Sequence, residues 1–227
     1  GAVSNKNIVA VLIEGLRRLE YRGYDSAGIS IHTGNDITTL KRAGKLSVLN
    51  DALSAQPMPN GNLGIGHTRW ATHGSPIDRN AHPHTDPERK VALIHNGIIE
   101  NYLLLKSHLE SNGHHFESDT DSEVVAHLLG NEYAESKSLT KAMQAVCQKL
   151  KGNFSLVAIA VDAPGMLVGA RRNSPLVVGL GEKENFLASD VSAFISYTKN
   201  ALELGQDQVV EVSPSHVVVT DLAGKKI

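Results

Sequence analysis

The chain has 227 residues, of which 41% are hydrophobic and 20% charged, and its formal net charge is -2. This charge excludes the strongly basic balance typical of proteins that bind nucleic acid or anionic membranes, and no apolar run approaches the roughly 20 residues of a membrane span. A single cysteine, Cys147, excludes an internal disulfide and fits a reducing compartment such as the cytoplasm.

The first part of the chain predicts one strand, one helix and a hairpin. Gly1-Ala2-Val3 reads as a strand entered partway along, so the chain is expected to lack residues at its front. Apolar residues at helical spacing between Val9 and Leu19 predict an amphipathic helix that ends before Gly23. Residues 28–32 and 36–42, joined by a Thr-Gly-Asn turn, predict a hairpin.

The middle of the chain predicts helices separated by one irregular stretch. A short helix is expected through residues 46–53, and residues 63–87 are expected to be largely irregular. Val91–Ile94 predicts a buried strand that stops at Asn96-Gly97. Further helices are expected around residues 105–109, after the capping box Thr120-Asp121-Ser122-Glu123, and along residues 139–150.

The last third of the chain predicts a return to strands, at residues 154–161, 166–170, 176–180, 185–188, 209–212 and 217–220. Helices and strands do not alternate regularly, which argues against a doubly wound parallel sheet. We therefore expect one α+β domain over residues 1–227, with two mostly antiparallel sheets and helices packed outside them.

Polar residues crowd into three segments beside the apolar strands, as functional groups held on loops often do. These segments are YRGYDSAG at residues 21–28, HTRWATHG at 67–74 and His-Asn-Gly at 95–97. Together they resemble the glutaminase domain of the glucosamine-6-phosphate synthase family, which belongs to the N-terminal-nucleophile hydrolases. The resemblance covers the whole chain and implies a four-layer αββα sandwich.

The resemblance also implies a nucleophile that this sequence does not contain. Members of the family begin with Cys-Gly-Ile-Val immediately before the segment seen here as Gly1-Ala2. Their cysteine thiol attacks the side-chain amide of glutamine, and its own α-amine acts as the base, as suits a group that titrates near pH 8. A polypeptide without this segment is expected to release no glutamate from glutamine.

By the same resemblance, Asn96 and the backbone N–H of Gly97 form the oxyanion hole. Two such donors stabilise the negative oxygen of a tetrahedral intermediate. The dipeptide alone fits a different interpretation, because Asn-Gly is also a favoured type I′ hairpin turn.

The resemblance assigns Arg69 to the α-carboxylate of glutamine and Asp121 to its α-ammonium group. A guanidinium can hold a carboxylate with two parallel hydrogen bonds, which a lysine cannot. Without the resemblance, Arg69 would be taken as a surface residue and Asp121 as a charge that complements the helix dipole. Both roles of Asp121 could coexist.

Trp70, Thr72 and His73 match family positions that line or cover the glutamine pocket. Trp70, the only tryptophan, equally fits a partly buried packing residue. Arg22 and Asp25 belong to the same signature and are expected to tie loops together without a chemical role.

Two other sites can be considered from the residues alone. Five histidines suggest a metal site: His67, His73, His82, His84 and His95. The H-E-x-x-H spacing and paired cysteines are missing, so no metal or cofactor is expected. Cys147 lies on an apolar helical stripe and is expected to be a buried structural thiol.

The resemblance implies that the intact enzyme takes ammonia from L-glutamine and converts fructose 6-phosphate to glucosamine 6-phosphate. A sugar isomerase domain of the same polypeptide would be the partner, with a homodimer for the full-length protein and a monomer for this domain. Related enzymes that aminate phosphoribosyl pyrophosphate, aspartate or 2-oxoglutarate are alternatives. A glutamine-binding module without catalysis is an alternative of another class.

Overall fold

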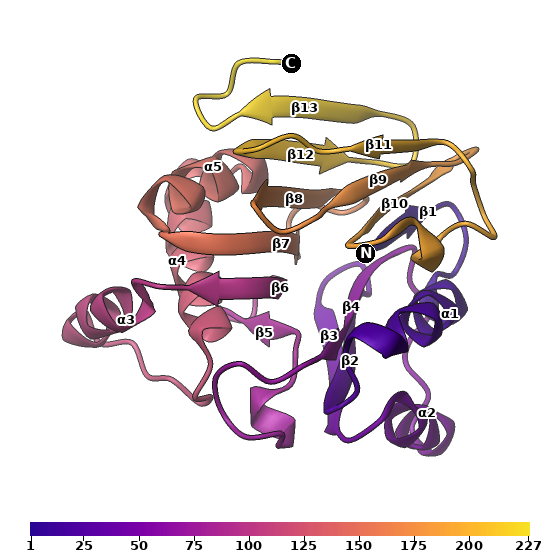
Figure 1. Ribbon diagram of the computed structural model, residues 1–227, viewed down its shortest axis with the longest axis horizontal. Helices are drawn as coiled ribbons and strands as arrows, with labels where there is room; N and C mark the ends of the chain where they lie inside the picture. The colour runs from indigo at the N-terminus through magenta and orange to yellow at the C-terminus, as the bar shows by residue number, and fades with distance from the viewer.

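Two antiparallel β-sheets form the centre of the structure, a computed structural model that describes residues 1–227 (Figure 1). The first sheet has the strand order β11-β9-β10-β1-β4-β2-β3 and the second has the order β13-β12-β8-β7-β6-β5. The first sheet is built from β1 (Ala2–Ser4), β2 (Ser26–His32), β3 (Ile37–Ala43), β4 (Leu63–Arg69), β9 (Val177–Leu180), β10 (Glu184–Ala188) and β11 (Ala201–Glu203). The second is built from β5 (His84–Thr85), β6 (Val91–Ile99), β7 (Gly152–Ala160), β8 (Leu167–Arg172), β12 (Gln208–Val212) and β13 (Val217–Asp221).

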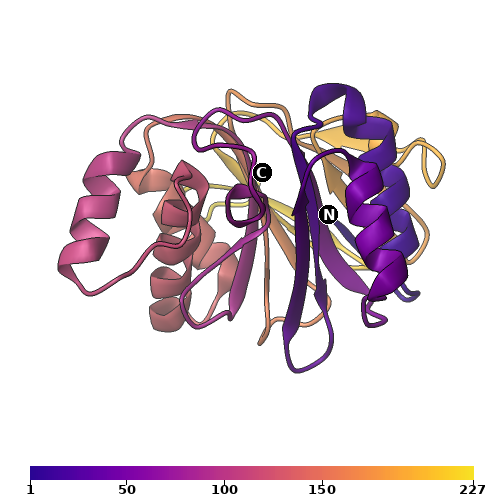
Figure 2. The same cartoon turned by 90° about the horizontal axis from the view of Figure 1, so that it is seen from below.

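Helices cover the outer face of each sheet (Figure 2). The first sheet carries α1 (Val9–Leu19) and α2 (Leu46–Ala55), and the second carries α3 (Tyr102–Ser111), α4 (Asp121–Ser136) and α5 (Leu139–Lys149). Short 3-10 helices, η1 (Glu20–Arg22), η2 (Asp78–Asn80) and η3 (Val191–Ala193), join the larger elements. The α+β class and the four-layer αββα arrangement predicted from the sequence are confirmed.

Each pair of neighbouring layers encloses an apolar core. Leu12 and Leu16 of α1 pack against Ile29 and Ile31 of β2 beneath the first sheet. A second core lies between the sheets, and a third lies between the second sheet and helices α4 and α5. Because an amphipathic sheet or helix is stable only when its apolar face is covered, these three cores fix the order of the layers.

The start of α4 confirms the predicted helix cap and changes one detail of it. The Thr120 side chain accepts a hydrogen bond from the backbone N–H of Glu123. The Glu123 carboxylate does not return to the Thr120 N–H, as a full capping box requires. Instead it accepts from the backbone N–H groups of Glu117 and Ser118.

The prediction for residues 63–87 is wrong at its beginning. Leu63–Arg69 is the central strand β4, which pairs with β1 on one side and β2 on the other. Its glycines and polar residues hid the period-two pattern, in which Leu63, Ile65, His67 and Arg69 are buried.

The prediction that a strand stops at Asn96-Gly97 is also wrong. Strand β6 continues through both residues to Ile99, and Asn96 and Gly97 pair with Ser155 and Phe154 of β7. The dipeptide is therefore not a type I′ hairpin turn. Gly97 has φ 126°, and an added Cβ would lie 2.0 Å from the carbonyl oxygen of Asn153. Only glycine fits this position.

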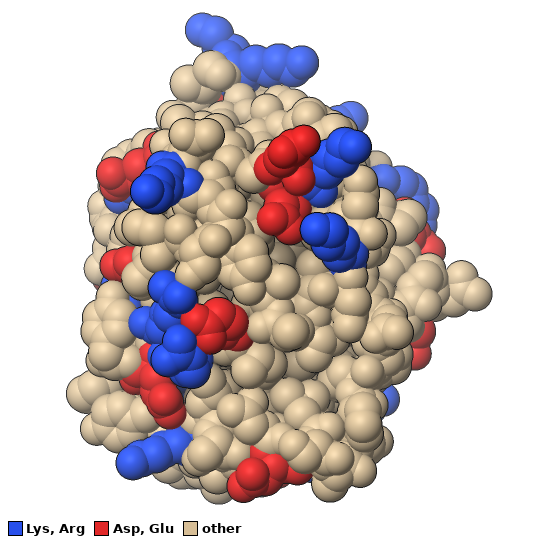
Figure 3. All heavy atoms as spheres, turned by 90° about the vertical axis from the view of Figure 1, so that its right-hand side faces the viewer, with Lys and Arg blue, Asp and Glu red and all other residues tan.

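The surface carries charges of both signs. On the face shown in Figure 3, acidic and basic side chains alternate over a largely uncharged surface. None of the helices combines the length and the apolar character that a bilayer span requires.

Candidate active site

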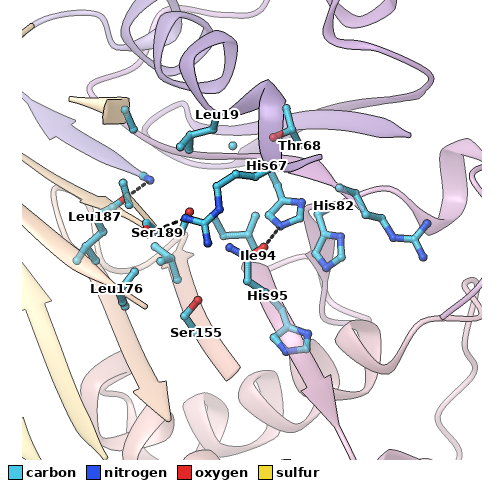
Figure 4. Close-up of a pocket in the computed structure, with 18 of the residues that line it drawn as sticks. Leu19, His67, Thr68, His82, Ile94, His95, Ser155, Leu176, Leu187 and Ser189 are labelled. Carbon is cyan, nitrogen blue, oxygen red and sulfur yellow. Dashed lines mark hydrogen bonds between the residues drawn. The ribbon is translucent and has the colours of Figure 1, made fainter. Parts of the chain in front are cut away.

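A cavity of about 460 Å³ opens where the two sheets meet the start of α4. It is lined by α1, β4, β6, β7, the end of β10 and the loop after β4, and Figure 4 shows side chains from these segments converging on it. All the residues assigned to the site from the sequence line this one cavity: Arg69, Trp70, Thr72, His73, Asn96, Gly97 and Asp121.

On one side of the cavity the first sheet has a slot, which lies between β10 and β4 beyond the start of β1. Strand β1 lies between β10 and β4, and its pairing with both strands ends at Ala2, opposite Phe186 and Gly64. Past that point the backbone of Gly1 still exchanges hydrogen bonds with Leu187 of β10. Residues 66–69 of β4 pair with β2 along one edge only. Their other edge faces residues 188–189 across the cavity.

Arg69 is almost fully buried, with 3% of its surface exposed. Its guanidinium donates to the carbonyl oxygens of His73 and Gly74 and lies 3.8 Å from the carboxylate of Asp25. Burial lowers the pKa of Arg69, and the nearby carboxylates of Asp25 and Asp121 oppose that effect. The guanidinium also donates to the carbonyl oxygen of Ser75 at 3.5 Å. Since a guanidinium has five N–H donors, these three contacts still leave donors for a ligand in the cavity.

Asp121 is the first residue of α4 and is also buried. Its Oδ2 accepts a hydrogen bond of 2.9 Å from the backbone N–H of Ile99, which ties the helix to the end of β6. Its Oδ1 lies 3.4 Å from the hydroxyl of Ser122 and 4.0 Å from His95 Nδ1. The carboxylate thus serves the fold and also presents negative charge to the cavity.

Asn96 and Gly97 lie on β6, on the wall opposite β4. Asn96 is exposed to the cavity, and its Oδ1 lies 2.8 Å from Nε2 of His67. This contact crosses from the second sheet to the first. The rigid strand pairing with β7 holds both residues at the cavity wall.

Trp70, Thr72 and His73 belong to the loop that leaves β4. Trp70 is 61% exposed and meets the ring of Tyr24 edge-on, with centroids 5.4 Å apart. Trp70 is thus more exposed than the packing interpretation expects, although it does pack against Tyr24. Thr72 is exposed, whereas the ring of His73 lies edge-on to Tyr102.

Arg22 and Asp25 connect segments around the cavity. Arg22 donates to the carbonyl oxygen of Ser189, across the mouth of the slot. The Asp25 carboxylate accepts from the backbone N–H of Ala71 and from the hydroxyl of Ser26. These contacts fit the loop-tying role expected from the sequence.

Four buried histidines lie at the inner wall of the cavity: His67, His82 and His95 line it, and His84 packs against His82. His82 Nε2 and His95 Nδ1 lie 2.8 and 2.9 Å from the hydroxyl of Ser122, and His84 Nε2 lies 3.1 Å from that of Thr120. Burial lowers the pKa of His67 to about 4. The same cause lowers the pKa values of His82, His84 and His95. At neutral pH these four rings are therefore uncharged, and they are hydrogen-bonded to hydroxyl or amide groups.

Sequence reasoning missed two parts of this site. The contact between His67 and Asn96 joins residues 29 positions apart, and no local spacing indicates it. The slot beside residues 187–189 depends on the pairing of β1 with β10, which lies far along the chain. Cys147 takes no part, since it is buried in the core behind the second sheet, where burial raises the pKa of its thiol to about 12.

Comparison with known proteins gives a consistent result. Residues 67–196 match the family described as "Glutamine amidotransferase domain". The chain is similar to the glutamine–fructose-6-phosphate aminotransferase (isomerizing) of Streptomyces coelicolor, at 56% identity over 99% of this chain and 36% of that protein. It is 51% identical to the enzyme of the same name from Thermus thermophilus, over 100% of this chain and 37% of that one. The chain thus spans little more than a third of these relatives.

Solved structures share the fold. Glutamine phosphoribosylpyrophosphate amidotransferase from B. subtilis superposes with a TM-score of 0.82 at 24% identity, over 97% of this chain and 48% of that one. A glutamine aminotransferase class-II domain protein from Silicibacter pomeroyi gives 0.55 at 14% identity, over 87% and 91% of the two chains. Both likenesses concern the fold alone.

Proposed function

The chain belongs to the family of glutamine amidotransferase domains, and from this premise we propose that its cavity hydrolyses the side-chain amide of L-glutamine. The observation that carries the proposal is the shared cavity of Arg69, Asp121 and Asn96-Gly97. A cation and an anion there are suited to the two charged groups of a free amino acid. The proposed oxyanion donors lie on the wall that would face the reacting amide.

We also propose that residues ahead of Gly1 continue β1 through the slot. Four more residues ahead of Gly1, in the register of Ala2 with Gly64, would set the first of them opposite Arg69 of β4. They would extend the strand by about 13 Å, at roughly 3.3 Å per residue. The exposed backbone edges of residues 66–69 and 188–189 would then find partners.

The environment of Gly1 supports a peptide bond at this position. Its amine donates to the carbonyl oxygen of Leu187 at 2.6 Å, and burial lowers the pKa of that amine to about 5. A peptide N–H would keep the same hydrogen bond and carries no charge at any pH. A cysteine four residues ahead, as the family resemblance implies, would bring its thiol into the cavity.

The reaction that we propose has two stages. The cysteine thiol loses its proton to the neighbouring α-amine and its sulfur bonds to the amide carbon, so that negative charge develops on the amide oxygen. Asn96 Nδ2 and the Gly97 N–H stabilise that oxygen. The C–N bond then breaks, the amine returns the proton and ammonia leaves. Water hydrolyses the resulting thioester to glutamate and restores the thiol.

The acceptor of the ammonia is proposed from the relatives. Their name indicates fructose 6-phosphate, and we propose that residues 1–227 act as one glutaminase domain attached to a sugar isomerase domain that forms glucosamine 6-phosphate. Such an enzyme would serve amino-sugar synthesis in the cytoplasm, as a homodimer, whereas this domain alone would be a monomer. Light scattering on residues 1–227 tests the last point.

The test of the glutaminase proposal is a comparison of three polypeptides. A chain that begins Cys-Gly-Ile-Val before Gly1 is expected to release glutamate from glutamine. The same chain with serine in place of that cysteine, and the chain that begins at Gly1, are expected to stay at the level of a no-enzyme control. Glutamate release by all three, or by none, would contradict the proposal.

The alternative functions predict other outcomes in the same assay. A glutamine-binding module would bind glutamine in calorimetry while the cysteine-bearing chain stayed inactive. Another acceptor would leave glutaminase activity intact, and the full-length protein would then fail to form glucosamine 6-phosphate.

A further inference from the structure

His67 makes the contact that fixes how the side chain of Asn96 faces the cavity. The Nε2 of His67 lies 2.8 Å from Asn96 Oδ1, and His67 is 7% exposed. His67 is on β4 of the first sheet and Asn96 is on β6 of the second, so this contact joins the two walls of the site (Figure 4). The proposed catalytic role of Asn96 needs its Nδ2, and not its Oδ1, to face the substrate.

The orientation of the amide depends on which ring nitrogen carries the proton. If Nε2–H of His67 donates to Oδ1, the Nδ2 group of Asn96 is turned away from His67 and remains free to donate. If the proton were on Nδ1, the amide would turn over and present an acceptor to a developing oxyanion. That arrangement would repel the negative charge that the site has to stabilise.

The surroundings of His67 favour the first arrangement. Its Nδ1 is buried without a hydrogen-bond partner. Buried N–H groups without an acceptor are rarer than buried acceptors without a donor, which places the proton on Nε2. The ring also lies 4.4 Å from the ring of His82, whose Nε2 is held by the hydroxyl of Ser122. This tilted contact with a fixed neighbour, at an interplanar angle of 34°, restrains the His67 ring.

We propose that His67 is a positioning residue, whose Nε2–H holds Asn96 with its amide donors directed at the oxyanion. This inference rests on the proposed glutaminase function and assigns His67 no contact with the substrate. Because the ring is neutral when buried, it orients Asn96 without adding charge to the site.

The test uses substitutions of similar volume in the chain that begins Cys-Gly-Ile-Val. His67→Gln keeps an N–H that can reach Asn96, whereas His67→Met fills the space but cannot donate. Loss of a single oxyanion donor costs about 100- to 1,000-fold in kcat, and loss of its orientation is expected to cost about 10- to 100-fold. The KM for glutamine is expected to stay within about threefold, because Arg69 and Asp121 are untouched.

A matched control comes from another buried histidine. His32 on β2 has its Nε2 2.8 Å from the carbonyl oxygen of Val161 and does not line the cavity. His32→Met is expected to lower stability and leave kcat unchanged. A merely structural role of His67 would make the two methionine variants behave alike.

Binding of inhibitors gives a second measurement. A glutamine analogue with an aldehyde in place of the amide forms a tetrahedral adduct with a thiol and needs the oxyanion hole, whereas glutamate does not. His67→Met is expected to weaken the aldehyde at least about tenfold and leave glutamate unchanged, and His67→Gln is expected to restore the aldehyde.

The outcomes separate the two proposals. An inactive parent chain would overturn the glutaminase function and this inference with it. An active parent with equal kcat in the glutamine and methionine variants would overturn only the role of His67. A rise in KM without a fall in kcat would do the same.

Discussion

Arg69 lines the cavity, and its guanidinium also donates hydrogen bonds to the protein backbone. Two of its contacts hold the carbonyl oxygens of His73 and Gly74, so the residue also shapes the loop that carries Trp70 and Thr72. A lysine has one point charge and cannot hold the loop and a carboxylate together.

Substitution of Arg69 is therefore expected to act on glutamine binding. In the cysteine-bearing chain, Arg69→Ala should raise the KM for glutamine about 100-fold and Arg69→Lys about tenfold, which corresponds to about 2.7 and 1.4 kcal/mol. Steady-state kinetics measures both. Arg79→Ala is the control, because Arg79 is 56% exposed in its side chain and pairs with Asp119 outside the cavity. An unchanged KM for Arg69→Ala would remove the assignment.

At the scale of single residues, the sequence identified the side chains with distinctive chemistry. Arg69, Asp121 and Asn96 stand in motifs whose order could be compared with a family, and the structure brings them to one cavity. The sequence suggests no role for His67 beyond a metal ligand and a place in HTRWATHG, because its partner Asn96 lies on the other sheet. A contact of that kind depends on the packing of the layers and has no local pattern.

At the scale of elements, most helices and strands followed from periodicity, and two of the errors fell on strands that line the site. The short strands β5 and β11 were not predicted either. Strand β4 places His67 and Arg69 at positions that a purely structural strand would fill with apolar residues. In β6 the Asn96-Gly97 pair interrupts the apolar pattern with a positive φ. At these positions polar residues of the candidate site stand where apolar residues would complete the alternating pattern from which strands are predicted.

The start of α4 is held by one buried carboxylate. Glu123 accepts from the N–H groups of Glu117 and Ser118 and from the Ser118 hydroxyl. Burial alone would raise its pKa, but hydrogen bonds from His127, Ser118 and the backbone hold the pKa of Glu123 at about 2. The carboxylate therefore anchors the loop that leads to Asp121.

Glu123→Gln is expected to lower the free energy of unfolding by about 2 kcal/mol, because one acceptor oxygen becomes an amide that faces a donor. Urea denaturation at neutral pH measures the loss. Glu135→Gln in the same helix changes an exposed carboxylate and should have little effect. Equal stability of the two variants would show that the hydrogen bonds of Glu123 contribute nothing net.

At the scale of the whole molecule, the sandwich places its polar groups between layers that are otherwise apolar. The buried histidines at the inner wall of the cavity lie near the junction of the two sheets, where little of each ring is open to water. The layered fold was predictable because each layer has its own apolar periodicity. The burial of these histidines could not be predicted, because it depends on how the edges of the two sheets meet.

Buried neutral histidines make the fold sensitive to acid. The pKa of His67 falls from 6.5 to about 4 on folding, and burial also lowers the pKa values of His82, His84 and His95. Between pH 6.5 and 4 the unfolded chain binds protons at His67 that the folded chain does not. Stability is therefore complete above this window and falls as the pH falls through it.

The free energy of unfolding is expected to drop between pH 7.5 and pH 5, with about 2 kcal/mol of the loss from His67 alone. Urea denaturation at several pH values measures the slope. His67→Gln should recover that share of the loss, while His115→Gln, which changes an exposed histidine, should keep the slope of the parent. A free energy of unfolding that stays constant from pH 7.5 to 5 would mean that these rings titrate alike in both states. In that case the inference that a neutral His67 ring orients Asn96 would lose its physical basis.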